Sequence, residues 1–185
     1  MFSLRLCMLM LVLAIACYAA GQPVYRVQKS TITFNSDAPN ELIKATSKKL
    51  KGLVNSGKKQ FAFKVDVVSF EGFNSPLQRE HFNENYMESF KYADISFSGK
   101  IIEDVDLSKD GKYTIRAKGE LNIHGVGRDR IIYADVVSKN GIIEVVSDFR
   151  VALADHDIKI PRVVNDKLAT EVYINVNMIL LEQKP

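Results

Sequence analysis

The chain has three side chains suited to acid–base or metal chemistry, the imidazoles of His81, His124 and His156. His81 and Glu84 are three residues apart, a spacing that on a helix brings an imidazole within reach of a carboxylate. No pair has the HxH or HxxxH spacing typical of metal ligands. The pattern favours structural histidines that hydrogen-bond loops and hold a helix in place. A metal-dependent enzyme that uses all three is the alternative.

Nucleophilic and phosphate chemistry has weaker support. Both cysteines, Cys7 and Cys17, lie in the first 21 residues, so the rest of the chain has no thiolate, cysteine ligand or disulfide. No Gly-x-Ser-x-Gly motif is present, and residues 125–128 (Gly-Val-Gly-Arg) precede a strand pattern, which predicts a hairpin turn and not a phosphate loop. Tryptophan is absent and the basic residues are dispersed. We therefore expect no catalytic residue, no cofactor, no metal and no nucleic-acid partner.

Residues 112–153 indicate the elements that position the rest of the chain. Apolar and polar residues alternate over 112–124 and again over 143–153, and Asp110-Gly111 and Asn140-Gly141 suit two-residue hairpin turns. A period of two that lasts for more than ten residues is typical of long antiparallel strands with one buried face. Strands of this length favour a curled sheet or barrel.

Further alternating runs predict strands at 25–34, 60–73, 93–102 and 169–181, with a bulge or bend near Ser69. Residues 41–54 fit a helix or a strand equally. Ser75-Pro76 is a typical helix start, and the spacing of Leu77, Phe82, Tyr86 and Met87 predicts a helix over 76–89. The chain is thus expected to form an extended antiparallel β-barrel of about eight strands with one principal helix.

Residues 1–21 have the layout of a secretory signal peptide: Arg5, an apolar stretch and the small residues Ala19-Ala20-Gly21. We expect cleavage after Gly21, which leaves one domain over 22–185. Arg5 is the only charge removed, so the formal net charge falls from +3 to +2. A lipoprotein that begins at Cys17 is the alternative. The expected location is the periplasm, and a membrane partner and the choice between monomer and homodimer stay open.

Small residues at the middle of the inward strand faces bear on what the barrel contains. Ala117, Gly119 and Ser147 leave space where a filled barrel would have bulky side chains. Alternatively, facing strands supply the bulk, or Gly119 marks a bend. The residues alone leave a ligand cavity and a filled core, such as a structural envelope protein would have, equally open.

Several motifs resemble the YceI-like family of secreted bacterial proteins. They span nearly the whole chain after residue 21, in order: Phe70-Glu71-Gly72-Phe73, Gln78-Arg79-Glu80-His81-Phe82-Asn83-Glu84-Asn85-Tyr86-Met87, Phe97-Ser98-Gly99-Lys100-Ile101, Gly119-Glu120-Leu121-Asn122-Ile123-His124-Gly125-Val126, Phe149-Arg150-Val151, Asp155-His156-Asp157-Ile158 and Pro161. The resemblance implies a lipocalin-like barrel whose interior holds an isoprenoid or other lipid chain. One departure is Lys29, which stands where many members have a histidine, so the headgroup contact is expected to differ.

The resemblance favours a non-enzymatic carrier whose lipid lies against the inward strand residues. These are Phe61, Phe63, Val65, Val67, Ile95, Phe97, Tyr113, Ile115, Ala117, Gly119, Leu121, Ile143, Val145, Ser147, Phe149, Val151, Val172, Ile174, Val176 and Met178. His81, Glu84 and His156 are candidates for polar groups that cap one end.

Overall fold

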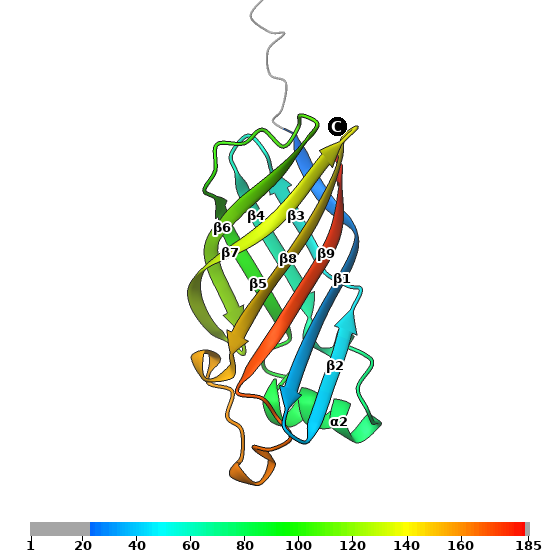
Figure 1. The fold of residues 1–185 in the computed structure, drawn as a ribbon, viewed down its shortest axis with the longest axis vertical. Coiled ribbons are helices and arrows are strands. Elements are labelled where there is room, and N and C mark those ends of the chain that lie inside the picture. The colour runs from blue at the N-terminus through cyan, green and yellow to red at the C-terminus, as the bar shows by residue number, and fades with distance from the viewer. Residues whose placement is uncertain (1–22, 184–185) are drawn as a thin grey trace, which may run out of the picture.

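The computed structural model describes residues 23–183. Nine antiparallel strands curl into one barrel (Figure 1). They are β1 (Val24–Ala38), β2 (Glu41–Ser47), β3 (Lys51–Asn55), β4 (Gln60–Asp66), β5 (Asp94–Ile101), β6 (Gly111–Ile123), β7 (Val126–Lys139), β8 (Ile142–Ala152) and β9 (Glu171–Glu182). Pairing of β1 with β9 closes the barrel. β2 and β3 pair with opposite ends of β1, so the closed wall has eight strand positions. The expected antiparallel, lipocalin-like barrel is confirmed.

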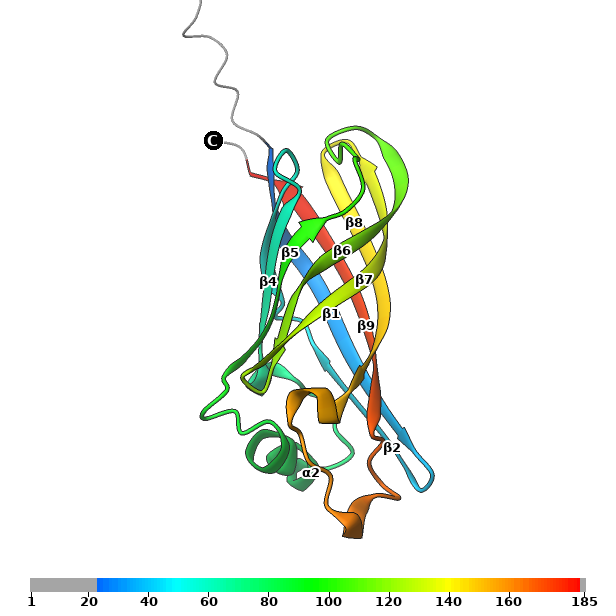
Figure 2. The ribbon, with the colours of Figure 1, turned by 90° about the vertical axis from the view of Figure 1, so that its left-hand side faces the viewer.

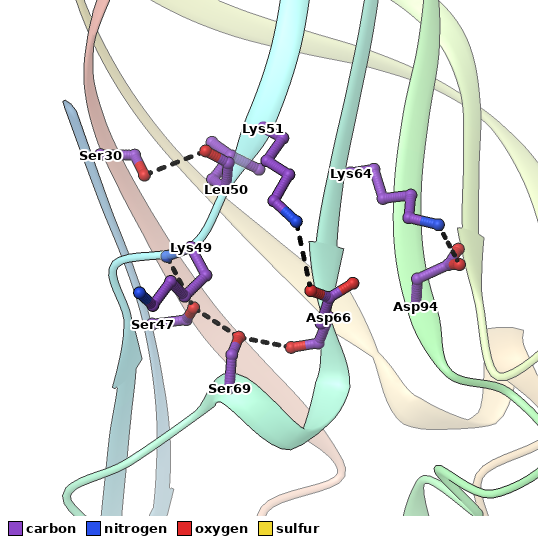
Figure 3. Close-up of polar contacts among 9 residues, drawn as sticks. All are labelled: Ser30, Ser47, Lys49, Leu50, Lys51, Lys64, Asp66, Ser69 and Asp94. Atoms are coloured by element: carbon purple, nitrogen blue, oxygen red, sulfur yellow. Dashed lines mark hydrogen bonds and ion pairs between the residues drawn. The ribbon is translucent and has the colours of Figure 1, made fainter. Parts of the chain in front are cut away.

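Between β2 and β3 the chain leaves the sheet, and serine hydroxyls hold it to the neighbouring turn (Figure 3). Ser47 Oγ and Ser69 Oγ lie 2.7 Å apart, and Ser69 Oγ donates to the Asp66 carbonyl at 2.5 Å. Within residues 23–183, the edge of β2 that is not paired with β1 has only an isolated bridge from Thr46 to Glu71. The wall is therefore incomplete here, at one end of the barrel.

Short helical segments gather at that same end (Figure 2). They are the 3₁₀ turns η1 (Val67–Ser69), η3 (Leu153–His156) and η4 (Arg162–Val164), the helix α2 (Pro76–His81) and the π-helical turn η2 (Phe82–Tyr86). Ser75 caps α2 as expected, because its Oγ accepts from the Gln78 N–H at 3.1 Å. None of the helices within residues 23–183 is long and apolar enough to cross a membrane.

Several predicted boundaries were wrong. The helix expected over 76–89 changes at Phe82 into a π turn and ends at Tyr86, since the Met87 N–H bonds to the Phe82 carbonyl at 2.9 Å. The strand expected over 60–73 ends at Asp66 in a 3₁₀ turn. Asp110-Gly111 is no hairpin turn, because Gly111 starts β6 after the loop 102–110. Asn140-Gly141 does form the expected turn, with φ of 53° and 75°, and residues 41–54 contain strands.

The barrel interior holds three groups of packed side chains along its length. One surrounds Tyr25, Leu107 and Leu180 at the end away from α2. The others surround Val67 and Phe70 near the helical segments. The end with the loop 102–110 is called the closed end below, and the end with α2 the mouth.

Candidate ligand-binding cavity

An apolar cavity of about 210 Å³ lies inside the barrel. Inward side chains of the strands form its wall because the period of two turns every second residue toward the axis. Ser96 and Ser147 are the only polar residues among those that line it, and Ser147 Oγ donates to the Tyr133 carbonyl at 2.6 Å. The cavity thus offers almost no hydrogen bond to a ligand. Apolar cavities of roughly 150 Å³ stay dry and take up apolar molecules.

Most of the predicted wall residues line this cavity. They are Phe61, Phe63, Val65, Ile95, Phe97, Ile115, Ala117, Leu121, Ile143, Val145, Ser147, Phe149, Val151, Val172, Ile174, Val176 and Met178. The rings of Phe61 and Phe97, on β4 and β5, lie 4.8 Å apart. Phe63 stacks beside Phe61 at 5.6 Å. Aromatic and branched side chains of neighbouring strands therefore make a continuous apolar wall.

Three predicted wall residues do not line the cavity. Val67 is fully buried in the packed group near the mouth. Tyr113 lies by the loop 102–110, where its hydroxyl donates to the Lys109 carbonyl at 3.1 Å. Gly119 faces Gly99 across β5 and β6, and a Cβ on Gly119 would stand 2.1 Å from the Ser98 carbonyl oxygen. The absence of a side chain at Gly119 lets the backbones of β5 and β6 lie close together, so it does not create space for a ligand.

The loop 102–110 covers the closed end. Leu107 turns inward, is 3% exposed and lines the cavity. Ser138 Oγ donates to the Leu107 carbonyl at 2.8 Å and holds the loop to β7. Val105 packs on the same group of side chains. This end is therefore closed by an apolar plug.

At the other end the cavity adjoins a second hollow of about 360 Å³, which we call the vestibule. Side chains that line both spaces mark the boundary between them: Phe34, Phe82, Met87, Leu153 and Ile158. The vestibule also has a polar side, made by Ser36, Glu41, Ser75, Gln78, His81, Tyr86 and Lys167. The apolar cavity thus opens toward a hollow of mixed polarity at the mouth.

Aromatic rings narrow this boundary. Phe82, in η2, stacks on Phe34 of β1 with centroids 5.3 Å apart and planes 19° apart. Phe73 contacts Phe82 at 5.0 Å, and Phe70 contacts Phe34 at 5.6 Å. The helical segment is attached to the barrel largely through this group of rings.

Hydrogen bonds also tie α2 to β2. Glu41 Oε1 accepts from Gln78 Nε2 at 2.9 Å and from Asn74 Nδ2 at 3.3 Å. Ser36 Oγ accepts from the Ala169 N–H at 2.9 Å. Three of the polar vestibule residues, Ser36, Glu41 and Gln78, therefore already bind the segments that frame the mouth.

The predicted capping residues occupy three different environments. His81 lines the vestibule, whereas Glu84 is exposed and lines neither space. No hydrogen bond or ion pair joins the two side chains within the described residues. His156 is fully buried away from both hollows, and its Nδ1 donates to the Val126 carbonyl at 2.9 Å. Burial lowers the pKa of His156 below its usual value. His156 thus belongs to the framework of the mouth.

His124 also belongs to that framework. Its Nε2 lies 2.7 Å from Glu88 Oε2, just after η2, and its Nδ1 lies 3.2 Å from the His156 carbonyl. These contacts connect the β6–β7 turn to η3 and to the segment after η2. Within residues 23–183 no group of three or more histidine, cysteine or acidic side chains is placed to hold a metal ion.

Lys29, at the position where many members of the resembling family have a histidine, is exposed on the outer wall.

Sequence reasoning missed the side chains that form the inner boundary of the mouth. Phe70, Phe82, Met87 and Ile158 lie in irregular segments or short helices, where no period of two marks the inward positions. Leu153, in η3, is in phase with the alternation over 143–153. Two signals pointed to this group: the shifted phase of Phe70 and Phe73 relative to the strand before them, and the helical spacing of Phe82 and Met87.

Comparison with known proteins gave one family and several similar folds. The family model for the YceI-like domain matches residues 25–180. A polyisoprenoid binding domain from Saccharophagus degradans has a TM-score of 0.72 at 14% identity, over 86% of this chain and 98% of that chain. Burkholderia cenocepacia BcnA has a TM-score of 0.66 at 14% identity, over 81% and 95%. The Campylobacter jejuni YceI protein has a TM-score of 0.56 at 16% identity, over 77% and 86%. No curated protein matches significantly.

Proposed function

The chain belongs to the YceI-like family, and on that premise we propose that it is a non-enzymatic periplasmic carrier of a lipid with a long apolar tail. The tail occupies the 210 Å³ cavity, and the polar end of the lipid faces the vestibule. The observation that carries the proposal is the cavity itself, which is apolar, plugged by Leu107 and open to the mouth.

Burial alone supplies enough free energy for such a carrier. Each CH₂ group removed from water contributes about 0.8 kcal/mol, so a tail of several such groups binds without any reactive side chain. The walls lack hydrogen-bonding groups apart from Ser96 and Ser147, which suits a hydrocarbon and does not select a polar molecule. An isoprenoid chain fits this chemistry, and the polyisoprenoid binding domain with the similar fold supports that ligand class.

The periplasmic location rests on residues 1–21, which lie outside the described part of the chain. Their charged start, apolar stretch and small residues are those of a secretory signal. Intact-mass measurement of the protein purified from the native host tests this directly. We expect a chain that begins at Gln22, and a lipid-modified Cys17 would instead place the protein on a membrane.

Organic extraction of the purified protein followed by mass spectrometry tests the carrier function. We expect about one long-chain apolar molecule per protein, with an isoprenoid fragmentation pattern. A protein that carries no lipid and takes none up from isoprenoid-containing vesicles would contradict the proposal. Stoichiometric metal together with a hydrolytic activity would replace it with the enzyme reading.

A further inference from the structure

Large apolar side chains are exposed around the mouth. Val163 is 85% exposed, Phe90 81%, Leu42 57%, Leu77 56% and Val68 53%. They belong to five segments that are separate in the sequence: η4, the turn after η2, β2, α2 and η1. We call these five residues the mouth rim. Figure 2 shows α2, η4 and the start of β2 at the same end of the barrel.

Phe90 is held outward by an ordered turn. The N–H groups of Lys91 and Tyr92 both donate to the Glu88 carbonyl, at 2.8 and 2.9 Å. The Glu88 carboxylate binds His124, and the Tyr92 ring packs edge-on against His124 with centroids 4.5 Å apart. These bonds fix the turn from both sides. The turn therefore fixes Phe90 in its exposed position, and exposed apolar side chains that gather in a patch mark contact surfaces.

The mouth rim is continuous with the vestibule. Leu77 belongs to both, and Val164, next to Val163, also lines the vestibule. A lipid tail that left a bilayer at this rim would pass along apolar side chains to Phe34 and Phe82 at the cavity boundary. It would thus avoid water, where every CH₂ group of the tail is unfavourable.

Apolar side chains at the closed end are less exposed than those of the mouth rim. In the loop 102–110, Val105 and Leu107 pack on the core, while Ile102 is 40% exposed. The other residues of this loop are Glu103, Asp104, Asp106, Ser108, Lys109 and Asp110. The hairpin turn at that end is Asn140-Gly141. Ile142, beside this turn, is also 40% exposed. The apolar side chains exposed at the closed end thus reach 40% exposure, whereas all five residues of the mouth rim exceed 50%.

We propose that the mouth rim docks on the surface of a lipid bilayer, with Phe90 and Val163 inserted among the lipids. The proposal rests on the carrier function, since docking puts the cavity mouth against its source of lipid. Lys91 follows Phe90 and Arg162 precedes Val163, so each tip has a cation that can reach the phosphate groups. Glu80 and Glu84 are also exposed nearby. The contact is therefore mainly apolar and binds zwitterionic lipid with little dependence on salt.

The absence of tryptophan from the chain allows a sharp test. Phe90→Trp and Val163→Trp each introduce a single tryptophan on the mouth rim. Vesicles of phosphatidylcholine with brominated acyl chains should shift the emission of both to the blue and quench it. Tyr133→Trp is the matched control, because position 133 is 61% exposed on the outer wall of β7. Its emission should not change. Each tryptophan reports lipid contact at its own position. Residues 1–22 are the same in all variants, so any contact that they make with vesicles does not affect the comparison.

Loss of the two tips should weaken docking. We expect Phe90→Ser combined with Val163→Ser to bind phosphatidylcholine vesicles at least about 10-fold more weakly in sedimentation, from the apolar area removed. Ile131→Ser combined with Tyr133→Ser removes exposed apolar area from β7 and should bind as wild type does. Circular dichroism checks that all variants fold.

The proposal would be overturned if vesicles changed neither the wavelength nor the intensity of tryptophan emission at positions 90 and 163. So would a blue shift without vesicles that grows with protein concentration, since two copies would then pair through the rim. Lipid extraction separates the two claims. If the protein docks on vesicles but never carries lipid, the carrier function is wrong and the docking proposal stands. If lipid is extracted but the protein does not dock, the docking proposal is wrong and the carrier function stands.

Discussion

The two ends of the barrel have walls of the same alternating strands and differ in what lies across them. At the closed end one loop turns Leu107 into the barrel and fixes it through Ser138. At the mouth, separate short segments meet through the rings of Phe34, Phe73 and Phe82 and through hydrogen bonds that the Glu41 carboxylate accepts. The closed end is thus held by one loop packed on the core, and the mouth by side-chain contacts between several segments. Under the proposed carrier function, we expect a ligand to enter and leave at the mouth.

The largest effect should come from the plug. Leu107→Ala removes a buried side chain from the closed end and should lower the free energy of unfolding by about 3 kcal/mol. Leu42→Ala, the same change on an exposed leucine at the mouth, should shift it by less than about 0.5 kcal/mol. Urea unfolding measures both. Equal costs at the two ends would remove the contrast between them.

The second-largest loss of stability should come from the site where the backbones of Gly99 and Gly119 lie close together. Gly119→Ala places a methyl group against the Ser98 carbonyl and should cost about 2 kcal/mol of stability. Gly127→Ala is the matched control on the adjoining strand, because its new Cβ meets the movable Glu120 carboxylate. A Gly119→Ala protein as stable as the Gly127→Ala protein would show that position 119 has free space after all.

The mouth should lose stability in acid through His156. Burial lowers its pKa in the folded state, so below about pH 6.5 the unfolded chain binds a proton that the folded chain does not. Stability therefore falls as pH drops, by at most about 1.4 kcal/mol per pH unit for one group. We expect His156→Gln to have a shallower slope between pH 6.5 and 5 in urea unfolding. His81→Gln is the control on an exposed histidine, and an equal slope for the wild type and both variants would refute the assignment.

The contrast between the ends also explains what the sequence could predict. Strand walls follow a period of two, so residues such as Phe61, Val145 and Met178 could be placed on the cavity side from alternation alone. Phe82 and Met87 were placed on the apolar stripe of a helix, but their helical spacing did not assign them to the cavity, because a π turn sets their direction. Gly119 was misjudged since a small residue equally allows a void or a close backbone, and only the facing Gly99 decides between them. His156 was a candidate for a polar cap, and its full burial places it in the framework of the mouth instead.

Ala117→Phe tests most directly whether the cavity is the ligand space. Ala117 lines the cavity on β6, two residues from Gly119. In a hollow barrel the new ring occupies space that the lipid tail would fill. The variant protein freed of lipid should therefore unfold at nearly the wild-type temperature, and its lipid content by mass spectrometry should drop sharply. Lipid must be removed from both proteins before unfolding, because bound ligand itself raises apparent stability. A variant destabilised by the 1–3 kcal/mol typical of overpacking, with undiminished lipid in its folded fraction, would contradict the account.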